Sequence, residues 1–471
     1  MLMMISKKIA ACACVALATG IFGLQSAQAA IPIQHWVQPS GAQVWLVESP
    51  SIPMLDVLVE FDAGSRRDPA TQAGLADVTA LMAGKGVAAR HGEPALDENQ
   101  LGQAWADLGA SFGASAGADR LSFGLRTLTD PELLQRAVAL AGRELGEPAW
   151  PEAVWQRERE RLSAALRESL TRPGTQAARA FSKAVYGTHP YGYEMTPESL
   201  ARIGVADMRA RYAADVLPCR AHVSLVGAVG RAQADALVTQ LLARLPQGGA
   251  CPALPPVPEV APLAAPQRID IPFDSAQAQV LIGQPGYRRD DPAFFALLVG
   301  NHILGGGGFT SRLMEQVREK RGLSYSVYSA FAPGRNAGAF SVGLQTRPDQ
   351  ADEATRVATA VVQQFVADGP TAAELKAAKD NLIGSFPLRL DSNRKLLDNV
   401  ANIAWNHLPL DYLAHWTERV NAVTAEQIKA AFQRVLQPQN MVTVVVGGAN
   451  QSRQTPGATS SDSASAASPA R

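Results

Sequence analysis

The 471-residue sequence is poor in the features that mark several protein classes. Charged residues make up only 18% of it, and 43 basic residues balance 43 acidic ones, so the formal net charge is zero. Such a chain offers no basic surface for nucleic acid or for an anionic membrane. Its seven histidines include no pair four residues apart, the spacing that places two imidazoles on one helical face. We therefore expect no nucleic-acid partner and no helical zinc site built from histidines.

The first 29 residues are predicted to be a signal peptide. Two lysines precede an apolar stretch at residues 9–24, and residues 27–29 form a small-x-small cleavage site. The apolar stretch is short for a membrane span, and no cysteine follows the cleavage site. We expect a periplasmic or secreted protein with no membrane span in the mature chain. An uncleaved N-terminal anchor is the alternative.

Cysteine is scarce, and two of the four cysteines lie within the predicted signal peptide. The other two are Cys219, which opens an apolar strand, and Cys251, which lies just after the following helix. A helix that returns along its strand ends near the strand's beginning, and exported proteins mature in an oxidising space. A disulfide between Cys219 and Cys251 is therefore one interpretation, and two unpaired thiols is the other.

The sequence also repeats itself. A strand followed by Gly-Ser-Arg-Arg-Asp-Pro at residues 64–69 recurs as a strand followed by Gly-Tyr-Arg-Arg-Asp-Asp-Pro at 286–292. A helix, a proline and an apolar strand occupy residues 205–227 and again 424–447. Two matched pairs in the same order, offset by nearly the same number of residues, indicate an internal duplication.

The duplication predicts an α+β fold built from two homologous α/β-sandwich domains, at residues 30–250 and 268–449. Their strands alternate apolar and polar residues, so one face of each sheet should be covered by helices and the other partly open. The linker, residues 251–267, is rich in proline and should be stiff. The tail, residues 450–471, is dominated by small and polar residues and should be disordered.

One segment of the first domain carries a motif without its chemistry. After the strand and the Arg-Arg-Asp-Pro turn comes Gly74-Leu75-Ala76-Asp77, an order that resembles the insulinase (pitrilysin) family of zinc peptidases. Active members read Gly-Leu-Ala-His-x-x-Glu-His there, and the family's two domains close like a clam shell. Here Asp77 and Leu81 stand at the histidine positions and Ala80 at the catalytic glutamate. The resemblance therefore implies no zinc cofactor in this chain, because two ligands and the general base are missing.

The family's third zinc ligand is a glutamate on a later helix. Aligning this region on Pro173 places Ala165 at the ligand position and Glu158 at its partner, whereas aligning on the last glutamate selects Glu168. A solvated helix with charge pairs one turn apart explains the glutamates and arginines of this stretch without a metal. We favour that interpretation.

The second domain, in contrast, resembles the family signature almost word for word. Its glycine run is Gly305, Gly306, Gly307 and Gly308, and an Arg-x6-Tyr pair follows, Arg318 and Tyr325. In the family this pair reaches the active site of the first domain. The resemblance implies that Arg318 grips a substrate carbonyl and that Tyr325 donates to the developing oxyanion. A surface arginine beside a packed tyrosine is the alternative.

The glycine run is not a phosphate-binding loop, because Phe309 occupies the position of the Walker lysine. Glycines here would permit close approach of substrate or of the opposite domain.

Two overlapping G-x-S-x-G matches at 109–117 follow a helix rather than a strand, which excludes a serine hydrolase. In the family this region is an edge strand to which substrate adds, and Gly113 stands where an asparagine is usual.

A further loop, with Tyr186, His189 and Tyr191, also resembles a family motif and is expected to be structural.

Together the motifs of the two domains imply the non-catalytic subunit of an exported zinc peptidase. The partner would carry H-x-x-E-H and the zinc, and unfolded peptides would be the substrates. The alternative is a peptide-binding or scaffold protein with no proteolytic role, and an active peptidase with another site is a third class.

Overall fold

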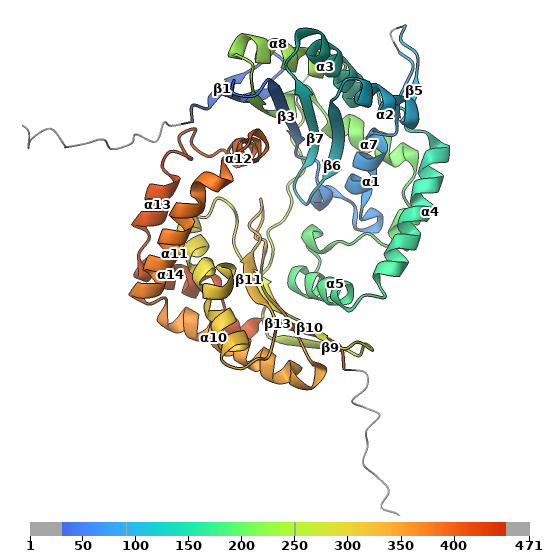
Figure 1. The fold of residues 1–471 in the computed structure, drawn as a ribbon. Helices are drawn as coiled ribbons and strands as arrows, with labels where there is room; N and C mark the ends of the chain where they lie inside the picture. The colour runs from blue at the N-terminus through green and yellow to red at the C-terminus, as the bar shows by residue number, and fades with distance from the viewer. Residues whose placement is uncertain (1–30, 91, 249–250, 449–471) are drawn as a thin grey trace, which may run out of the picture.

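The computed structural model describes residues 31–90, 92–248 and 251–448, and it has the predicted α+β class (Figure 1). The predicted signal peptide and the predicted tail lie outside these residues. Two mixed sheets face one another across the centre of the molecule, and most helices lie outside them. No helix in the described ranges is long and apolar enough to cross a membrane.

The first half contains a six-stranded sheet in the order β1-β2-β8-β3-β7-β6. Its strands are β1 (Gln34–Val37), β2 (Gln43–Glu48), β3 (Met54–Phe61), β6 (Ser111–Ala116), β7 (Leu121–Leu128) and β8 (His222–Gly227). Its helices are α1 (Leu75–Ala83), α2 (Glu98–Asp107), α3 (Pro131–Gly146), α4 (Glu152–Ser169), α5 (Pro173–Tyr186), α6 (Pro197–Ala201), α7 (Val205–Asp215) and α8 (Arg231–Leu242). A short hairpin pairs β4 (Gly86–Val87) with β5 (Leu96–Asp97).

The second half contains a five-stranded sheet in the order β11-β12-β10-β13-β9. Its strands are β9 (Gln267–Ile271), β10 (Ala278–Pro285), β11 (Val327–Phe331), β12 (Ala339–Thr346) and β13 (Val442–Val446). Its helices are α9 (Phe294–Asn301), α10 (Ala351–Asp368), α11 (Ala372–Ser385), α12 (Asn393–Trp405), α13 (Trp416–Ala422) and α14 (Ala425–Val435), with π-helical turns at His302–Gly306 and Met314–Glu319. Each sheet has one parallel pair at the same place, β2–β8 and β13–β9, so the duplication extends to topology.

The repeated turn supplies an aspartate that caps the following helix in both halves. The carboxylate of Asp68 accepts the N–H groups of Gly74 and Ala76 at the start of α1, at 3.0 and 3.1 Å. Asp291 accepts the N–H of Ala293 before α9 and pairs with Arg434 of α14 at 2.7 Å. The first N–H groups of a helix have no partner within the helix, so each aspartate stabilises the helix that follows it.

The two halves interlock by exchanging a helix. Helix α5 of the first half packs on β10 and β13, and helix α12 of the second half packs on β8 and β3 (Figure 1). Phe181 and Val185 of α5 share an apolar cluster with the valines of β13. The inner face of each sheet, expected to be partly open, is therefore partly covered by a helix from the opposite half.

The linker is bound along its length. Cys219 and Cys251 form a disulfide, with their Cα atoms 6.1 Å apart, which ties the beginning of the linker to the segment before β8. The carbonyl oxygen of Pro258 lies 2.9 Å from Nε2 of His189 in the first half and accepts from the Asn336 amide of the second at 3.1 Å. The linker thus joins both halves by hydrogen bonds as well as by the chain.

Candidate peptide-binding site

Helix α1 is present, but the face that carries the zinc ligands in active family members has no metal-binding side chains beyond Asp77. Asp77 is exposed, Ala80 is buried and Leu81 is half-buried. Over the described residues, no group of three histidine, cysteine, aspartate or glutamate side chains is placed to hold a metal ion. An aspartate, an alanine and a leucine can neither complete a zinc site nor activate its water.

Helix α4 has the predicted charge pairs, with one difference. Ala165 and Glu168 are exposed, and Glu168 pairs with Arg172 at 2.6 Å. Glu158, however, is only 4% exposed rather than solvated. Lys85, which directly follows α1, reaches its carboxylate at 3.3 Å, and Arg161 reaches it at 2.7 Å. Burial raises the pKa of Glu158, but these cations and Arg157 outweigh burial and hold it below its usual value, so the carboxylate is already paired.

Arg318 and Tyr325 form an exposed stack with a residue that sequence reasoning missed. The guanidinium of Arg318 lies 4.7 Å from the ring centre of Phe309 and 5.1 Å from that of Tyr325. Tyr325 is 83% exposed and Phe309 65% exposed. Neither the Arg318 guanidinium nor the Tyr325 hydroxyl bonds to any other described residue. The stack holds Arg318 in place by cation–π attraction while its donors stay available to a ligand. The signal in the sequence was an aromatic residue directly after the glycine run.

The glycine run has another explanation than substrate approach. A Cβ on Gly305 would lie 2.4 Å from the backbone nitrogen of Ser329 in β11, and one on Gly307 would lie 2.6 Å from the His302 carbonyl oxygen. A Cβ on Gly306 would meet the Asn301 side chain at 2.9 Å. Only at Gly308, whose φ is +62°, is the space around an added Cβ open. Three of the four glycines therefore serve packing within the second half.

Strand β6 is an open sheet edge. Gly117 N–H donates to the Arg120 carbonyl at 2.8 Å, which fixes the register of β6 against β7. Because antiparallel bonding alternates, the main-chain groups of residues 112, 114 and 116 point away from β7. No hydrogen bond within the described ranges engages them, and a Cβ on Gly113 would meet nothing within 4 Å. This edge has room for an added strand.

The equivalent edge in the second half, β11, is closed. The Asn301 amide donates to the Ser329 carbonyl at 3.2 Å, and Val327 N–H lies 3.5 Å from the sulfur of Met314. The two halves share a topology but differ here, because residues before and after the glycine run cover β11. Of these two equivalent edges, β6 is the one with room for an added strand.

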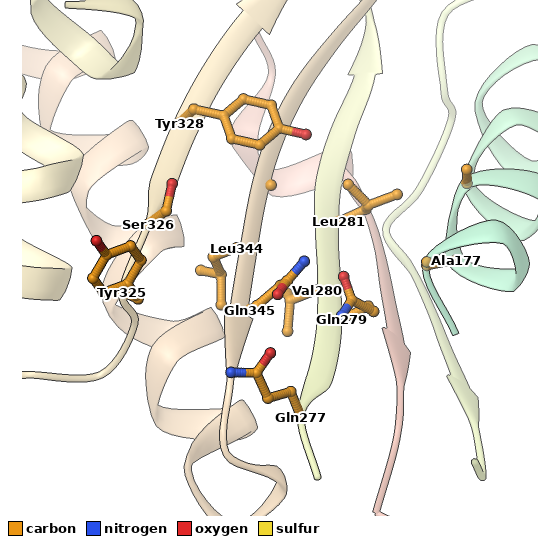
Figure 2. A pocket seen from close by; sticks show the side chains of 13 residues that line it. Ala177, Gln277, Gln279, Val280, Leu281, Tyr325, Ser326, Tyr328, Leu344 and Gln345 are labelled. Carbon is orange, nitrogen blue, oxygen red and sulfur yellow. The ribbon is translucent and has the colours of Figure 1, made fainter. Parts of the chain in front are cut away.

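Tyr325 also stands at the rim of a cavity of about 420 Å³ between the two halves. Figure 2 shows its floor, formed by β10, β11 and β12, and its wall on α5. None of the residues that line it is charged. Because its wall belongs to the first half and its floor to the second, the cavity depends on the docking of α5 against the second sheet.

The loop expected to be structural joins the halves. The hydroxyl of Tyr186 accepts the Ala339 N–H at 2.9 Å. The hydroxyl of Tyr191 donates to Asp119 at 2.6 Å and accepts the Asn336 N–H at 3.2 Å. His189 bonds to the Pro258 carbonyl of the linker. Each of the three motif residues therefore contacts the opposite half or the linker.

Comparison with known proteins identifies the class of fold and site. A family model described as the peptidase M16 inactive domain matches residues 202–382. A solved peptidase M16 inactive domain from Pseudomonas fluorescens is 34% identical, with a TM-score of 0.82, over 88% of this chain and 97% of that one. A protease from Helicobacter pylori, 18% identical, has the same fold, with a TM-score of 0.80 over 89% and 100% of the two chains.

Relatives in other bacteria carry two kinds of name. A protein of Mycobacterium leprae named an uncharacterized zinc protease is 27% identical over 84% of this chain and 88% of its own length. A protein of Helicobacter pylori named a non-peptidase homolog is 32% identical over 33% of this chain and 36% of its own length. This chain belongs to the M16 family, which is the insulinase (pitrilysin) family, and it is an inactive member. The predicted membership of this family is confirmed.

Proposed function

We propose that this protein is the non-catalytic subunit of an exported M16 zinc peptidase. It presents Arg318 and Tyr325 to the active site of a metal-bearing homologue and helps to enclose an extended peptide. The observation that carries the proposal is the exposed stack of Phe309, Arg318 and Tyr325, whose polar donors bond to no other residue in the described ranges.

The chemistry of the stack supports this role. Hydrolysis of a peptide bond places negative charge on the carbonyl oxygen, and a hydroxyl and a guanidinium are suited to bind that charge. The α1 helix of this chain supplies neither a metal site nor a general base, so these donors would act on chemistry performed elsewhere. The open edge of β6 supplies main-chain groups that can hold an extended peptide.

An exported location is part of the proposal. The sequence begins with the features of a signal peptide, and the structure pairs Cys219 with Cys251. Disulfides persist in oxidising compartments such as the periplasm and are rare in the cytosol. Both features favour the periplasm or the exterior as the place where the protein works.

The test is reconstitution with an H-x-x-E-H homologue from the same cells. The pair should cleave an unstructured peptide, and Arg318→Ala or Tyr325→Phe should lower kcat by roughly 100-fold, as loss of one oxyanion donor does. Arg321→Ala is the matched control, because Arg321 is an exposed arginine of the same segment and should leave kcat unchanged. Full activity of the pair carrying Arg318→Ala, or failure to associate with any homologue, would favour a peptide-binding scaffold instead.

A further inference from the structure

Six polar side chains face the cavity at Tyr325. They are Gln277, Gln279, Gln345, Tyr325, Ser326 and Tyr328 (Figure 2). The three amides and three hydroxyls make no hydrogen bond to the described part of the chain. We propose that this cavity is a subsite for uncharged side chains of an extended peptide. The inference deepens the proposed function and rests on it, because it names the kind of substrate segment that the site accepts.

The floor of the cavity is set by strand register. Gln279 of β10 lies opposite Gln345 of β12, and Leu281 lies opposite Gly343 on the next rung of the same face. Tyr328 of β11 is opposite Gly343 as well, and a Cβ on that glycine would lie 2.6 Å from the Tyr328 hydroxyl. The tyrosine ring therefore rests against the glycine, which leaves the two amides uncovered.

The wall opposite the amides is made of small residues. Gly174 and Ala178 of α5 are exposed at the cavity, and Ala177 is buried beneath them. The resulting space of about 420 Å³ falls within the usual range of ligand pockets. Helix α5 belongs to the first half, so the subsite exists only when the halves are interlocked.

The composition of the lining defines the ligand. Each glutamine offers two donors and one acceptor, and each hydroxyl offers one donor, which suits main-chain amides and neutral polar side chains. Leu281, on the same face as the glutamines, adds apolar surface. A charged side chain that entered the cavity beyond its rim would lose water without meeting an opposite charge, because Arg318 lies beside Tyr325 at the rim and no charged residue lines the cavity itself. The lining therefore favours asparagine, glutamine or leucine over lysine or glutamate in the peptide.

The position of Tyr325 connects the subsite to the proposed function. Tyr325 belongs both to the exposed stack with Arg318 and to the rim of the cavity. A peptide whose scissile bond is held beside Tyr325 would carry its neighbouring residues into the cavity. The subsite would thus select sequence near the cleaved bond, while the chemistry takes place on the partner.

Peptide binding to the purified protein alone tests the inference. The probes are fluorescent unstructured peptides of one sequence with a central asparagine, leucine, lysine or glutamate. The asparagine and leucine peptides should bind about tenfold more tightly than the charged ones, a difference of about 1.4 kcal/mol. Ala178→Phe, which fills the cavity from its exposed wall, should weaken the neutral peptides by a similar factor. Ala360→Phe, at an exposed position on α10, is the control and should change nothing.

A second variant tests the cavity without changing helix α5. Gln345→Glu adds a carboxylate to the floor and should shift the preference toward the lysine peptide. Equal binding of all four peptides, or binding unchanged by both Ala178→Phe and Gln345→Glu, would overturn the subsite. Because the readout needs no partner, that result would leave the role of Arg318 and Tyr325 standing. Failure of the pair to form, with peptide discrimination intact, would instead remove the partner role and keep the subsite.

Discussion

At the scale of single residues, three side chains on α1 separate this protein from a zinc peptidase. Asp77 is exposed and has one oxygen-donor group, but Ala80 and Leu81 offer no polar atom. The nearby carboxylate of Glu158 is already paired with Lys85 and Arg161. The helix therefore keeps its fold while its metal face has become a structural surface.

Restoring the two imidazoles should not restore hydrolysis. In the double variant Asp77→His, Leu81→His, two histidines would share one helical face, but Ala80 supplies no general base and Ala165 no third ligand. We expect weak zinc binding at most and no chelator-sensitive cleavage of an unstructured peptide. Metal analysis of the purified variant, together with a peptidase assay, checks this, and the unaltered protein is the control. Stoichiometric zinc with measurable turnover in either protein would contradict it.

At the scale of elements, side chains of α2 and α3 meet at the end of α1. Glu144 of α3 is buried beside Gly84 at the end of α1 and accepts the indole N–H of Trp105 at 2.9 Å. Burial raises the pKa of Glu144 to about 7, and the Trp105 hydrogen bond offsets only part of that shift. This packing therefore holds a carboxyl group that is protonated over much of the acidic range.

This carboxyl group should make stability depend on pH. The folded protein keeps a proton on Glu144 that the unfolded chain releases near pH 4.5. Its stabilising contribution is therefore complete below pH 4.5 and is lost as pH rises through about 7, by about 3 kcal/mol at most. Glu144→Gln should remove that dependence, so its advantage over the unaltered protein grows from pH 5 to pH 8. Denaturant unfolding at both pH values measures it, with exposed Glu132→Gln on α3 as control. An identical pH profile for both variants would contradict the assignment.

At the scale of the whole molecule, two exchanged helices and a bound linker hold the halves together. Polar contacts converge where they meet: Arg335 N–H donates to Asp119 at 3.0 Å, and Asn336 bonds to the linker and to Tyr191. His189 sits in this junction, 5% exposed. The Pro258 carbonyl can only accept, so Nε2 of His189 carries the proton while Nδ1 accepts the Tyr191 N–H.

The junction should weaken on acidification. Burial lowers the pKa of His189 below its ordinary 6.5, and Arg66 lowers it further, against the opposing effects of the Pro258 carbonyl, Glu259 and Asp119. A depressed histidine pKa contributes stability that is present above pH 6.5 and is lost as pH falls through the folded value. Protonation would also remove the acceptor for the Tyr191 N–H. We expect the linker amides to lose protection against hydrogen exchange below pH 6, once the rates are corrected for the intrinsic pH dependence of exchange.

Comparison with a variant isolates the histidine in that experiment. His189→Gln should show the same corrected protection of the linker amides at pH 5 and pH 7, although the junction would be weaker at both values. Thr188→Ala, at the exposed residue next to it, should keep the pH dependence of the unaltered protein. An equal acid response in all three proteins would assign the effect to other groups.

The sequence by itself determined what this protein lacks and how it is built in outline. The identities of residues 77, 80 and 81 remove the zinc chemistry whatever the fold, because no arrangement of an aspartate, an alanine and a leucine supplies it. The repeated Arg-Arg-Asp turn indicated the duplication, because a capping aspartate acts within a few residues of the helix it stabilises. Arg318 and Tyr325 were singled out by the resemblance of the second domain to the family signature.

Only the tertiary structure decided how those parts are used. Lys85 reaches Glu158 across more than seventy positions of the chain, and Ala178 faces Gln345 across more than one hundred and sixty. The exchange of α5 and α12 brings such residues together, and no local pattern encodes which sheet a helix will cover. The buried state of Glu158 and the uncharged cavity follow from that exchange or from equally distant contacts. The glycine run packs against nearer residues of its own half, Asn301, His302 and Ser329. The residue types set the available chemistry, and the packing of the two halves decided where that chemistry is exposed.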